Sequence, residues 1–431
     1  MTLCPRRLWT TAMSLTCTGV LLISGCASNT EGPSTAQLSK APSVTFTQIG
    51  IDEVRADSES LVGATRRLGV AIAGQSAAGA NRIVSPWSLM TALAMVRAGA
   101  RGATADEIDR AAGPYTPRAV AALTGQVTAV GGDPGKVDEQ NPPTPPVFRQ
   151  ATGVFAQKSY PIGKQYLVEL SRYFDTGVYP VDFSTDQAQR AINEWTTVNT
   201  GSQITRAPNP PDKSTLLSLL STVYLAAAWN SPFPAAKTVE QGRFSVTPDR
   251  VVRTPMMANS GAFRIAEGPG WTAIELPYGT GELAMQVVLP ATGATTSTVL
   301  TDAVLSSVAA ELKSAQPRTV DVTLPRWQST ETIDLRTALQ TMGIRSLFTD
   351  RADLSGISPG LMVTRAAQSG TITVGEKGTV AAAVTKIDVG PTATPDQGIR
   401  FTADRPFVYQ IVDTSTALPL FLGVVSDPRS T

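Results

Sequence analysis

The residues that most often carry covalent or metal chemistry are nearly missing from this chain of 431 residues. It has no histidine, which excludes Ser-His-Asp and Cys-His hydrolases and any metal site built on imidazole. Its three cysteines, Cys4, Cys17 and Cys26, all lie near the N-terminus, so disulfides, thiolate metal sites and cysteine nucleophiles are excluded further along. We therefore expect no catalytic residue, no metal and no cofactor.

Two local patterns of polar residues favour ordinary structure over chemistry. Asp106 and Glu107 could form a paired-carboxylate site, but they fit the first turn of a helix, where acids are stabilised by the helix dipole. Gly279 and Gly281 fit a hairpin turn better than a phosphate loop, and the chain has no Walker or dinucleotide fingerprint. The charge balance, 36 basic and 35 acidic residues, gives no support for a nucleic-acid partner.

Cys26 is the one cysteine with a predicted chemical role. Arg6 and Arg7 precede an uncharged apolar run, 8–23, and small residues come directly before Cys26. This arrangement resembles a bacterial lipoprotein signal, in which the cysteine is lipidated and becomes the mature N-terminus. An ordinary secretory signal and a transmembrane helix are the alternatives, although the run is short for a membrane span. We expect 1–25 to be a signal peptide, and the protein to be exported and lipid-anchored to the cell membrane on its extracellular or periplasmic side.

Helical patterns come first along the chain, and strand patterns follow. Residues 27–46 are rich in Ser, Thr, Pro and Ala, so 26–50 is predicted to be the lipidated cysteine with a flexible tether, followed by one domain at 51–431. Helices are predicted at 53–73, 88–97, from Thr104 with its hydroxyl as cap, and 334–343, with a Gly/Pro-rich loop at 130–146. Strands are predicted at 222–225, 251–257, 271–276, 284–289, 319–324, 371–374, 408–412 and 420–425. Helices segregated from many strands indicate the α+β class.

The segment from Gly375 to Gly390 has the pattern of a loop that can become a strand. From Thr379 onward, alternate residues are small or apolar, and the charges Lys386 and Asp388 fall on the other set. This period of two suits a half-buried strand, and no proline interrupts it. The simpler interpretation is an Ala-rich surface loop without a function.

Strings of residues along most of the chain, from about 53 to 428, together resemble the serpins, a family of protease inhibitors. They are Asn81–Ser88, Leu93–Thr104, Val181–Phe183, Ile192–Trp195, Thr200–Ile204, Val223–Leu225, Trp229–Phe233, Leu324–Trp327, Met342–Ile344, Ala352–Ile357, Asp404–Phe407 and Leu420–Gly423. The resemblance implies the serpin fold. In that fold, a helical N-terminal part packs on a large mixed or antiparallel main sheet with smaller sheets, and a reactive loop, here about 376–400, is exposed.

The same resemblance implies a suicide inhibitor of serine proteases. A protease would cut the loop and form an acyl-enzyme, and insertion of the cut loop into the main sheet would trap it. Thr379 is then expected to be exposed before cleavage and buried afterwards, beside the strand that carries Ile372 and Val374. The implied hinge residues are Glu376, Gly378, Thr379, Ala381, Ala382, Ala383 and Thr385. The implied residues of the shutter, where the main sheet opens, or of structural roles are Asn81, Ser85, Pro86, Ser88, Asn193 and Gln368.

The bond that a protease would cut is predicted from spacing and from side-chain size. In inhibitory serpins the cut bond usually follows the residue sixteen positions after the hinge glutamate, so the resemblance implies Thr392–Ala393, counted from Glu376, whereas a count back from Pro406-Phe407 points nearer Pro395. Ala393–Thr394 is the alternative, because the neighbouring bonds involve proline. Both bonds present a small uncharged side chain. The target is therefore predicted to be an elastase-like or small-residue-preferring protease rather than a trypsin-like one.

The sequence also limits which other partners and functions are expected. Between 115 and 150 the only basic residues are Arg118, Lys136 and Arg149, so no heparin-like polyanion is expected. The protein is expected to be a monomer. Two alternatives stay open: a serpin-fold binding or structural lipoprotein without inhibitory activity, and an exported enzyme or solute-binding protein that only resembles a serpin.

Overall fold

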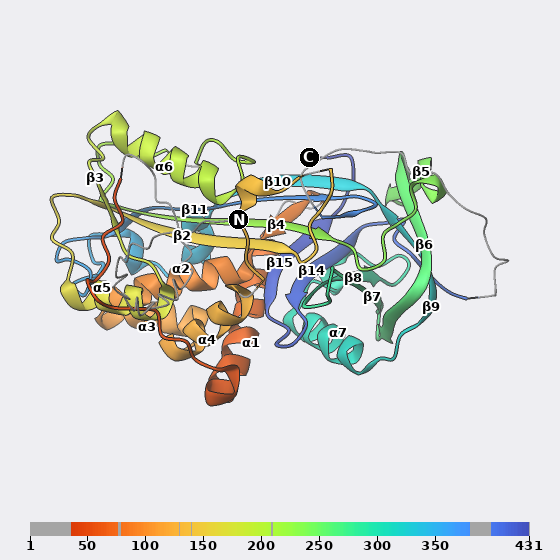
Figure 1. The fold of residues 1–431 in the computed structure, drawn as a ribbon, viewed down its shortest axis with the longest axis horizontal. Helices are drawn as coiled ribbons and strands as arrows, with labels where there is room; N and C mark the ends of the chain where they lie inside the picture. Colours follow the sequence, from red (N-terminus) through yellow and green to blue (C-terminus); the bar gives the residue numbers. More distant parts are fainter. Residues whose placement is uncertain are drawn as a thin grey trace, which may run out of the picture. The chain divides into compact units, whose positions relative to one another are not determined.

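A computed structural model of the chain describes residues 36–75, 79–128, 130–138, 140–207, 210–379 and 398–430. Within these ranges the chain forms a six-stranded and a nine-stranded sheet, and helices from the first half of the sequence gather against them (Figure 1). This is the α+β arrangement that the sequence predicted. None of the helices in these ranges combines the length and the apolar character that crossing a membrane requires.

The helices of the first half follow their apolar spacing, with shifts at the ends. Ser85 caps α2 by accepting a hydrogen bond from the backbone N–H of Ser88 (3.3 Å). The prediction that Thr104 caps the next helix is wrong, because α3 begins at Gly102 and the Thr104 hydroxyl accepts a hydrogen bond from the backbone of Asp353 instead. The α-helices are α1 (Arg55–Ala73), α2 (Pro86–Gly99), α3 (Gly102–Ala112), α4 (Pro117–Thr128), α5 (Lys164–Phe174), α6 (Asp186–Asn199), α7 (Asp302–Ser314) and α8 (Leu335–Thr341), and the 3-10 helices are η1 (Ile51–Val54), η2 (Pro134–Lys136), η3 (Ala235–Lys237), η4 (Thr296–Thr298) and η5 (Ser346–Phe348).

The six-stranded sheet is buried on both faces. Side chains alternate along its strand β4, so Leu219 joins the core on one face and Leu220 the core on the other. Helix α2 packs on the first face and α6 on the second (Figure 1). The strand order is β10-β11-β12-β4-β2-β3, with β2 (Val147–Gln157), β3 (Tyr179–Val181), β4 (Leu217–Ala228), β10 (Trp327–Asp334), β11 (Val363–Val374) and β12 (Gly378–Thr379).

The nine-stranded sheet contains most of the predicted strands. Its strand β6 runs far beyond the predicted end at 257, and the predicted hairpin turn at Gly279 and Gly281 joins β7 to β8. The strand order is β1-β15-β14-β8-β7-β6-β9-β13, and β5 pairs with β6. The strands are β1 (Arg82–Val84), β5 (Val239–Thr247), β6 (Arg250–Gly268), β7 (Trp271–Pro277), β8 (Leu283–Pro290), β9 (Arg318–Pro325), β13 (Ile399–Thr402), β14 (Phe407–Asp413) and β15 (Pro419–Val425).

Residues 36–49, which we call the N-terminal strap, pack against the body of the protein. Ser39 exchanges two backbone hydrogen bonds with Val178 (2.8 and 3.0 Å), and Ala36 is buried in the same core as Tyr179. The prediction of a flexible tether is therefore wrong for these residues, because a composition of small and polar residues does not exclude backbone pairing. Residues 1–35, with Cys26 and the predicted signal peptide, lie outside the described residues.

Candidate functional site: the loop hinge and the sheet around it

The first residues of the predicted hinge form a strand within the six-stranded sheet. Strand β12 lies between β4 and β11, where Thr379 pairs with Val374 on one side and with Ala227 on the other. A Cβ atom on Gly378 would lie 2.0 Å from the carbonyl oxygen of Ala227, so only glycine fits this close approach of two backbones. The sheet thus holds Gly378 and Thr379 in a defined register.

Thr379 is buried in the uncleaved chain, and the expectation that it is exposed before cleavage is wrong. Only 1% of the residue is exposed, and its hydroxyl shares a 2.6 Å hydrogen bond with the phenol of Tyr278. Val374, the neighbour predicted for the inserted loop, already pairs with Thr379 before cleavage. Burial raises the pKa of Tyr278, so the phenol stays neutral. Its ring stacks on that of Trp229, with centroids 4.4 Å apart. Thr379 can be buried before cleavage because its small side chain fits between β4 and β11 and its hydroxyl forms a hydrogen bond with Tyr278.

Three hydrogen bonds fix the backbone directly before β12. The indole N–H of Trp229 donates to the carbonyl oxygen of Gly375 (2.9 Å), and its backbone N–H donates to that of Lys377 (2.9 Å). The backbone N–H of Phe233 donates to the carbonyl oxygen of Glu376 (2.8 Å). Three successive backbone carbonyl groups of the hinge therefore accept hydrogen bonds from the segment that follows β4. These bonds fix the position at which the hinge enters the sheet.

The carboxylate of Glu376 anchors the hinge from its other side. It accepts hydrogen bonds from the guanidinium of Arg326, at 3.1 Å from Nε, and from the hydroxyl of Thr238 at 2.8 Å. Burial alone would raise the pKa of Glu376, but the hydrogen bonds from Arg326 and Thr238 outweigh it, and the pKa is lowered. Glu376 is thus an ionised, paired group.

Beyond β12, β4 and β11 pair directly with each other. The parallel pairs run from Leu217 opposite Val363 to Val223 opposite Gly370. A longer β12 would have to separate these pairs, because it would run between the same two strands. The described residues stop at Thr379 on this side of the loop. Outside them lie Ala381, Ala382, Ala383 and Thr385 of the predicted hinge and the predicted bond Thr392–Ala393.

Four of the predicted shutter residues lie together where β4 meets β11. The buried amide of Gln368 accepts a hydrogen bond from the backbone N–H of Ser85 (2.8 Å) and donates one to its carbonyl oxygen (3.0 Å). The hydroxyl of Ser88 contacts that of Ser221, which stands opposite Gln368 in the sheet. Pro86 starts α2 between these contacts. The start of α2 is thus fastened to both strands that would have to part.

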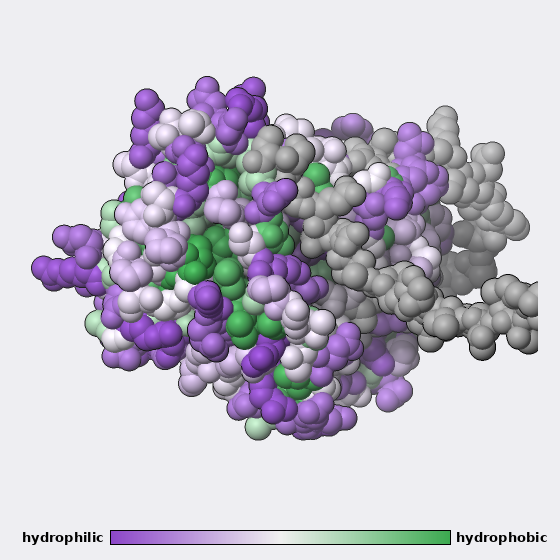
Figure 2. All heavy atoms as spheres, turned by 60° about the vertical axis from the view of Figure 1, so that its left-hand side comes forward, coloured by the Kyte–Doolittle hydropathy of each residue, from purple (hydrophilic) through white to green (hydrophobic). Residues whose placement is uncertain are grey.

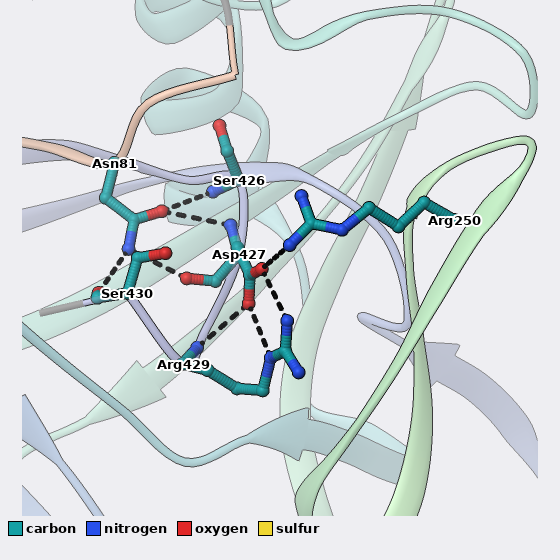
Figure 3. A network of polar contacts seen from close by, with 6 residues as sticks. All are labelled: Asn81, Arg250, Ser426, Asp427, Arg429 and Ser430. Carbon is teal, nitrogen blue, oxygen red and sulfur yellow. Dashed lines mark hydrogen bonds and ion pairs between the residues drawn. The ribbon is translucent and has the colours of Figure 1, made fainter.

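Asn81, also predicted for this group, lies elsewhere and fastens the C-terminal tail (Figure 3). Its side-chain oxygen accepts from the backbone N–H groups of Ser426 (2.8 Å) and Asp427 (3.0 Å), and its nitrogen donates to two carbonyl oxygens of the tail. The carboxylate of Asp427 accepts hydrogen bonds from Arg250 and Arg429, and those from Arg429 lower its pKa most. The role of Asn81 is therefore structural.

Asn193 also has a structural place. Its side-chain oxygen accepts hydrogen bonds from Gln189 (2.7 Å) on α6 and from the backbone N–H of Ala207 (3.0 Å), which fastens the following loop to the helix. Among the acids, Glu107 accepts hydrogen bonds from two backbone N–H groups at η5, as a helix cap does. The described residues contain no cluster of His, Cys, Asp and Glu that could hold a metal ion.

Two residues of the site were missed by the sequence analysis. Tyr278 and Arg326 contact Thr379 and Glu376, from which they are 101 and 50 positions distant. Tyr278 lies in no pattern that marks a functional role, and Arg326 was named only within the family string Leu324–Trp327. Trp229 was named only within a family string, and nothing in that string indicated its contact with the hinge.

Comparison of the sequence with known proteins finds similarity to one family. A family model described as "Serpin (serine protease inhibitor)" matches residues 64–428. A serine protease inhibitor of Cyanea capillata is 30% identical over 361 residues, 81% of this chain and 93% of that protein. An uncharacterised serpin-like protein of Thermococcus kodakarensis is 31% identical over 358 residues, 81% of each chain.

Solved structures agree on the fold. The thermophilic serpin tengpin in its native state superposes with a TM-score of 0.76 at 21% identity, covering 91% of this chain and 99% of tengpin. Uncleaved ovalbumin superposes with a TM-score of 0.71 at 24% identity, covering 85% of this chain and 100% of ovalbumin. At such identities these structures are similar to this chain in fold alone.

Proposed function

The chain belongs to the serpin family, and we propose that it inhibits serine proteases by inserting its cleaved loop into the six-stranded sheet. The observation that carries this proposal is strand β12. Gly378 and Thr379 already lie between β4 and β11 in antiparallel register, so the sheet accepts this segment as a strand. The continuation of the same period-two pattern after Thr379 suits a longer strand at the same place.

In the proposed mechanism the protease supplies every catalytic group. Its serine attacks the carbonyl carbon of the reactive bond, the new amino terminus leaves, and the hinge side of the loop stays attached as an ester. The freed segment then extends β12 and separates β4 from β11, beginning at the pair of Val223 and Gly370. The contacts of Gln368 with Ser85 beneath these strands would have to adapt at that step. The inhibitor itself contributes no catalytic residue.

We assign the target to proteases that prefer small residues. Thr392–Ala393 presents an uncharged side chain to the primary pocket of the protease, and Ala393–Thr394 does the same. A bovine leukocyte elastase inhibitor is among the relatives, at 28% identity over 365 residues, 81% of this chain and 93% of that protein. An alpha-1-antitrypsin homolog of Cyprinus carpio is also among the relatives, at 30% identity over 285 residues, so the choice of an elastase-like target rests on the small side chains of the loop.

The proposal includes a membrane location, because a cysteine lipidated at position 26 would hold the exported protein at the cell surface. The inhibitor would act there as a monomer and without a polyanion. Replacement Cys26→Ser should release the protein from the membrane fraction. Continued association of the Cys26→Ser protein with membranes would show that the cysteine is not the anchor.

Incubation with elastase and with trypsin tests the proposal. A covalent complex with elastase that survives denaturing electrophoresis is expected, with little complex formed by trypsin. Cleavage of the loop without a complex would favour the alternative of a serpin-fold binding or structural lipoprotein.

A further inference from the structure

The N-terminal strap is held to the body by several specific contacts. Beyond the backbone pair of Ser39 with Val178, the backbone N–H of Ala41 donates to the hydroxyl of Ser171 (3.0 Å), and Lys40 forms an ion pair with Asp175 (2.9 Å). These contacts join the strap to α5 and to the segment that leads into β3. The chain is therefore held to the body from Ala36 onward.

The body has a position shaped for the strap. At Gly177 a Cβ atom would lie 2.0 Å from the carbonyl oxygen of Ser39, so the strap can lie this close only because the residue is glycine. Gly125 offers a matched contrast, since a Cβ there would meet nothing within 4 Å. An alanine at Gly177 would thus displace the strap and leave the rest of the packing in place.

The strap joins the body at the opposite end of the sheet from the hinge. At the hinge, Thr379 pairs with Ala227 of β4. The strap instead pairs with Val178, the residue directly before β3. Strand β3 pairs with β2 at the position where β2 pairs with Ser218 of β4, so the strap lies near the Ser218 end of β4. The nine residue steps of β4 from Ser218 to Ala227 span about 30 Å at about 3.3 Å each. Figure 1 shows the same separation, with β3 at one end and β5 and β6 at the other.

We propose that the strap determines which end of the body faces the membrane, so that the reactive loop is presented to the aqueous phase and away from the lipid surface. This inference rests on the proposed anchor at Cys26. Ten residue steps from Cys26 to Ala36 reach at most about 35 Å, whatever conformation they take. If the hinge end of the body lay on the bilayer, the sheet alone would take up that whole length, and nothing would be left for β5 and β6.

The distribution of apolar and hydrophilic side chains at the strap end is consistent with attachment to the membrane through the lipid and not through this surface. Figure 2 turns this end toward the viewer and shows an apolar area bordered by hydrophilic side chains. A surface divided in this way is not an apolar face that inserts into a bilayer by itself. The acyl chains would provide the affinity, and the short connection to Ala36 would limit the orientation.

Energy transfer from single labelled cysteines to a vesicle surface tests the proposal. Cys26 is the only cysteine after the predicted signal peptide, so once it is lipidated an introduced cysteine is the only free thiol. Lys213→Cys reports on the strap end, and Val239→Cys, next to the Thr238 that contacts Glu376, reports on the hinge end. Each lipidated full-length protein is labelled with a donor and reconstituted in phosphatidylcholine vesicles that carry a headgroup acceptor.

Higher transfer from Lys213→Cys than from Val239→Cys is expected. In Gly177→Ala the connection should lengthen to the 21 residue steps from Cys26 to Thr47, about 70 Å, because the backbone N–H of Thr47 donates to the carbonyl oxygen of Arg172 (2.8 Å). The difference should then be lost, whereas Gly125→Ala should retain it. Equal or higher transfer from Val239→Cys with an intact strap would overturn the proposal, whether or not Gly177→Ala folds. Flotation with the vesicles distinguishes failure of the orientation from failure of the anchor. Protein that floats but shows no difference in transfer between the two labelled sites refutes the orientation alone. Protein that does not float refutes the anchor and the orientation with it.

Discussion

An arginine in place of Thr379 tests whether insertion at β12 is the step that traps a protease. Thr379 lies between β4 and β11, almost fully buried, and the described side chains at its position offer it only the neutral phenol of Tyr278 as a polar partner. An arginine cannot stay there without burying an unpaired charge. The uncleaved protein can avoid that cost by withdrawing β12 from the sheet, which forfeits the backbone pairing of Gly378 and Thr379 with β4 and β11, at about 1 kcal/mol for each hydrogen bond. The intact fold should therefore tolerate Thr379→Arg.

After cleavage the same substitution cannot be avoided, because the loop inserts through this position. An uncompensated buried charge costs about 3–5 kcal/mol. If that cost falls on the insertion barrier, insertion slows by roughly 10²- to 10⁴-fold, since each ~1.4 kcal/mol is a factor of ten in rate. The acyl-enzyme would then hydrolyse before the protease is trapped, and the inhibitor would become a substrate.

The assay is the fraction of protein found as a gel-stable covalent complex with elastase against the fraction merely cleaved. Wild type should be mostly complexed and Thr379→Arg mostly cleaved. Thr379→Ser is the matched control, since it keeps the hydroxyl for Tyr278 and should trap like wild type. Equal trapping by wild type and Thr379→Arg would refute the reasoning, because it would mean that no residue has to pass into the sheet at this position.

Three further predictions concern the loop and its hinge. Thr392→Arg should move inhibition toward trypsin-like proteases; if Ala393→Arg does this and Thr392→Arg does not, the reactive bond lies one residue further on. Gly378→Ala should expel β12 and increase proteolysis of the hinge, whereas Gly375→Ala, where a Cβ meets nothing within 4 Å, should not; equal proteolysis of both would contradict the close packing. Folding lowers the pKa of Glu376 below its ordinary 4.5, so its contribution to stability is complete above that value and is lost as pH falls through the folded pKa. The free energy of unfolding should therefore decrease less steeply in Glu376→Gln than in wild type between about pH 6 and about pH 3, and parallel curves would show that the pair with its arginine contributes nothing.

Elements with a strong pattern of their own could be predicted from the sequence. Strand β8 is predicted almost to its ends because Gln286 alone interrupts its apolar residues, and α2 because it is buried on most of its faces. Strand β2 was missed: Arg149, Gln150 and Thr152 interrupt its apolar pattern, although the strand lies inside the sheet. Strand β6 was predicted too short because much of it is half-buried and polar, and its length comes from pairing with β9 and β7.

The candidate site divides in the same way. The alternation from Thr379 onward predicts that Thr379 turns inward, and Thr379 is indeed buried; the residues of the alternation after it lie outside the described residues. It did not indicate that Thr379 is buried before cleavage, because that depends on Tyr278 and on the space between two strands from distant parts of the chain. The paired state of Glu376 was hidden for the same reason, since its partner Arg326 is brought close only by the fold.

The central claim is that the cut loop becomes a strand between β4 and β11, and the thermal stability of the loop-cleaved protein tests it most directly. The protein is nicked between 380 and 397 by a protease that is then removed, and its unfolding temperature is compared with that of the intact chain. An inserted strand forms backbone hydrogen bonds along both of its edges and replaces those between β4 and β11. About one edge of bonds is therefore gained, each worth about 1 kcal/mol net, so an increase of roughly 10 °C or more is expected. An unchanged or lower unfolding temperature after a clean cut in the loop would contradict insertion, even though the chain has the serpin fold.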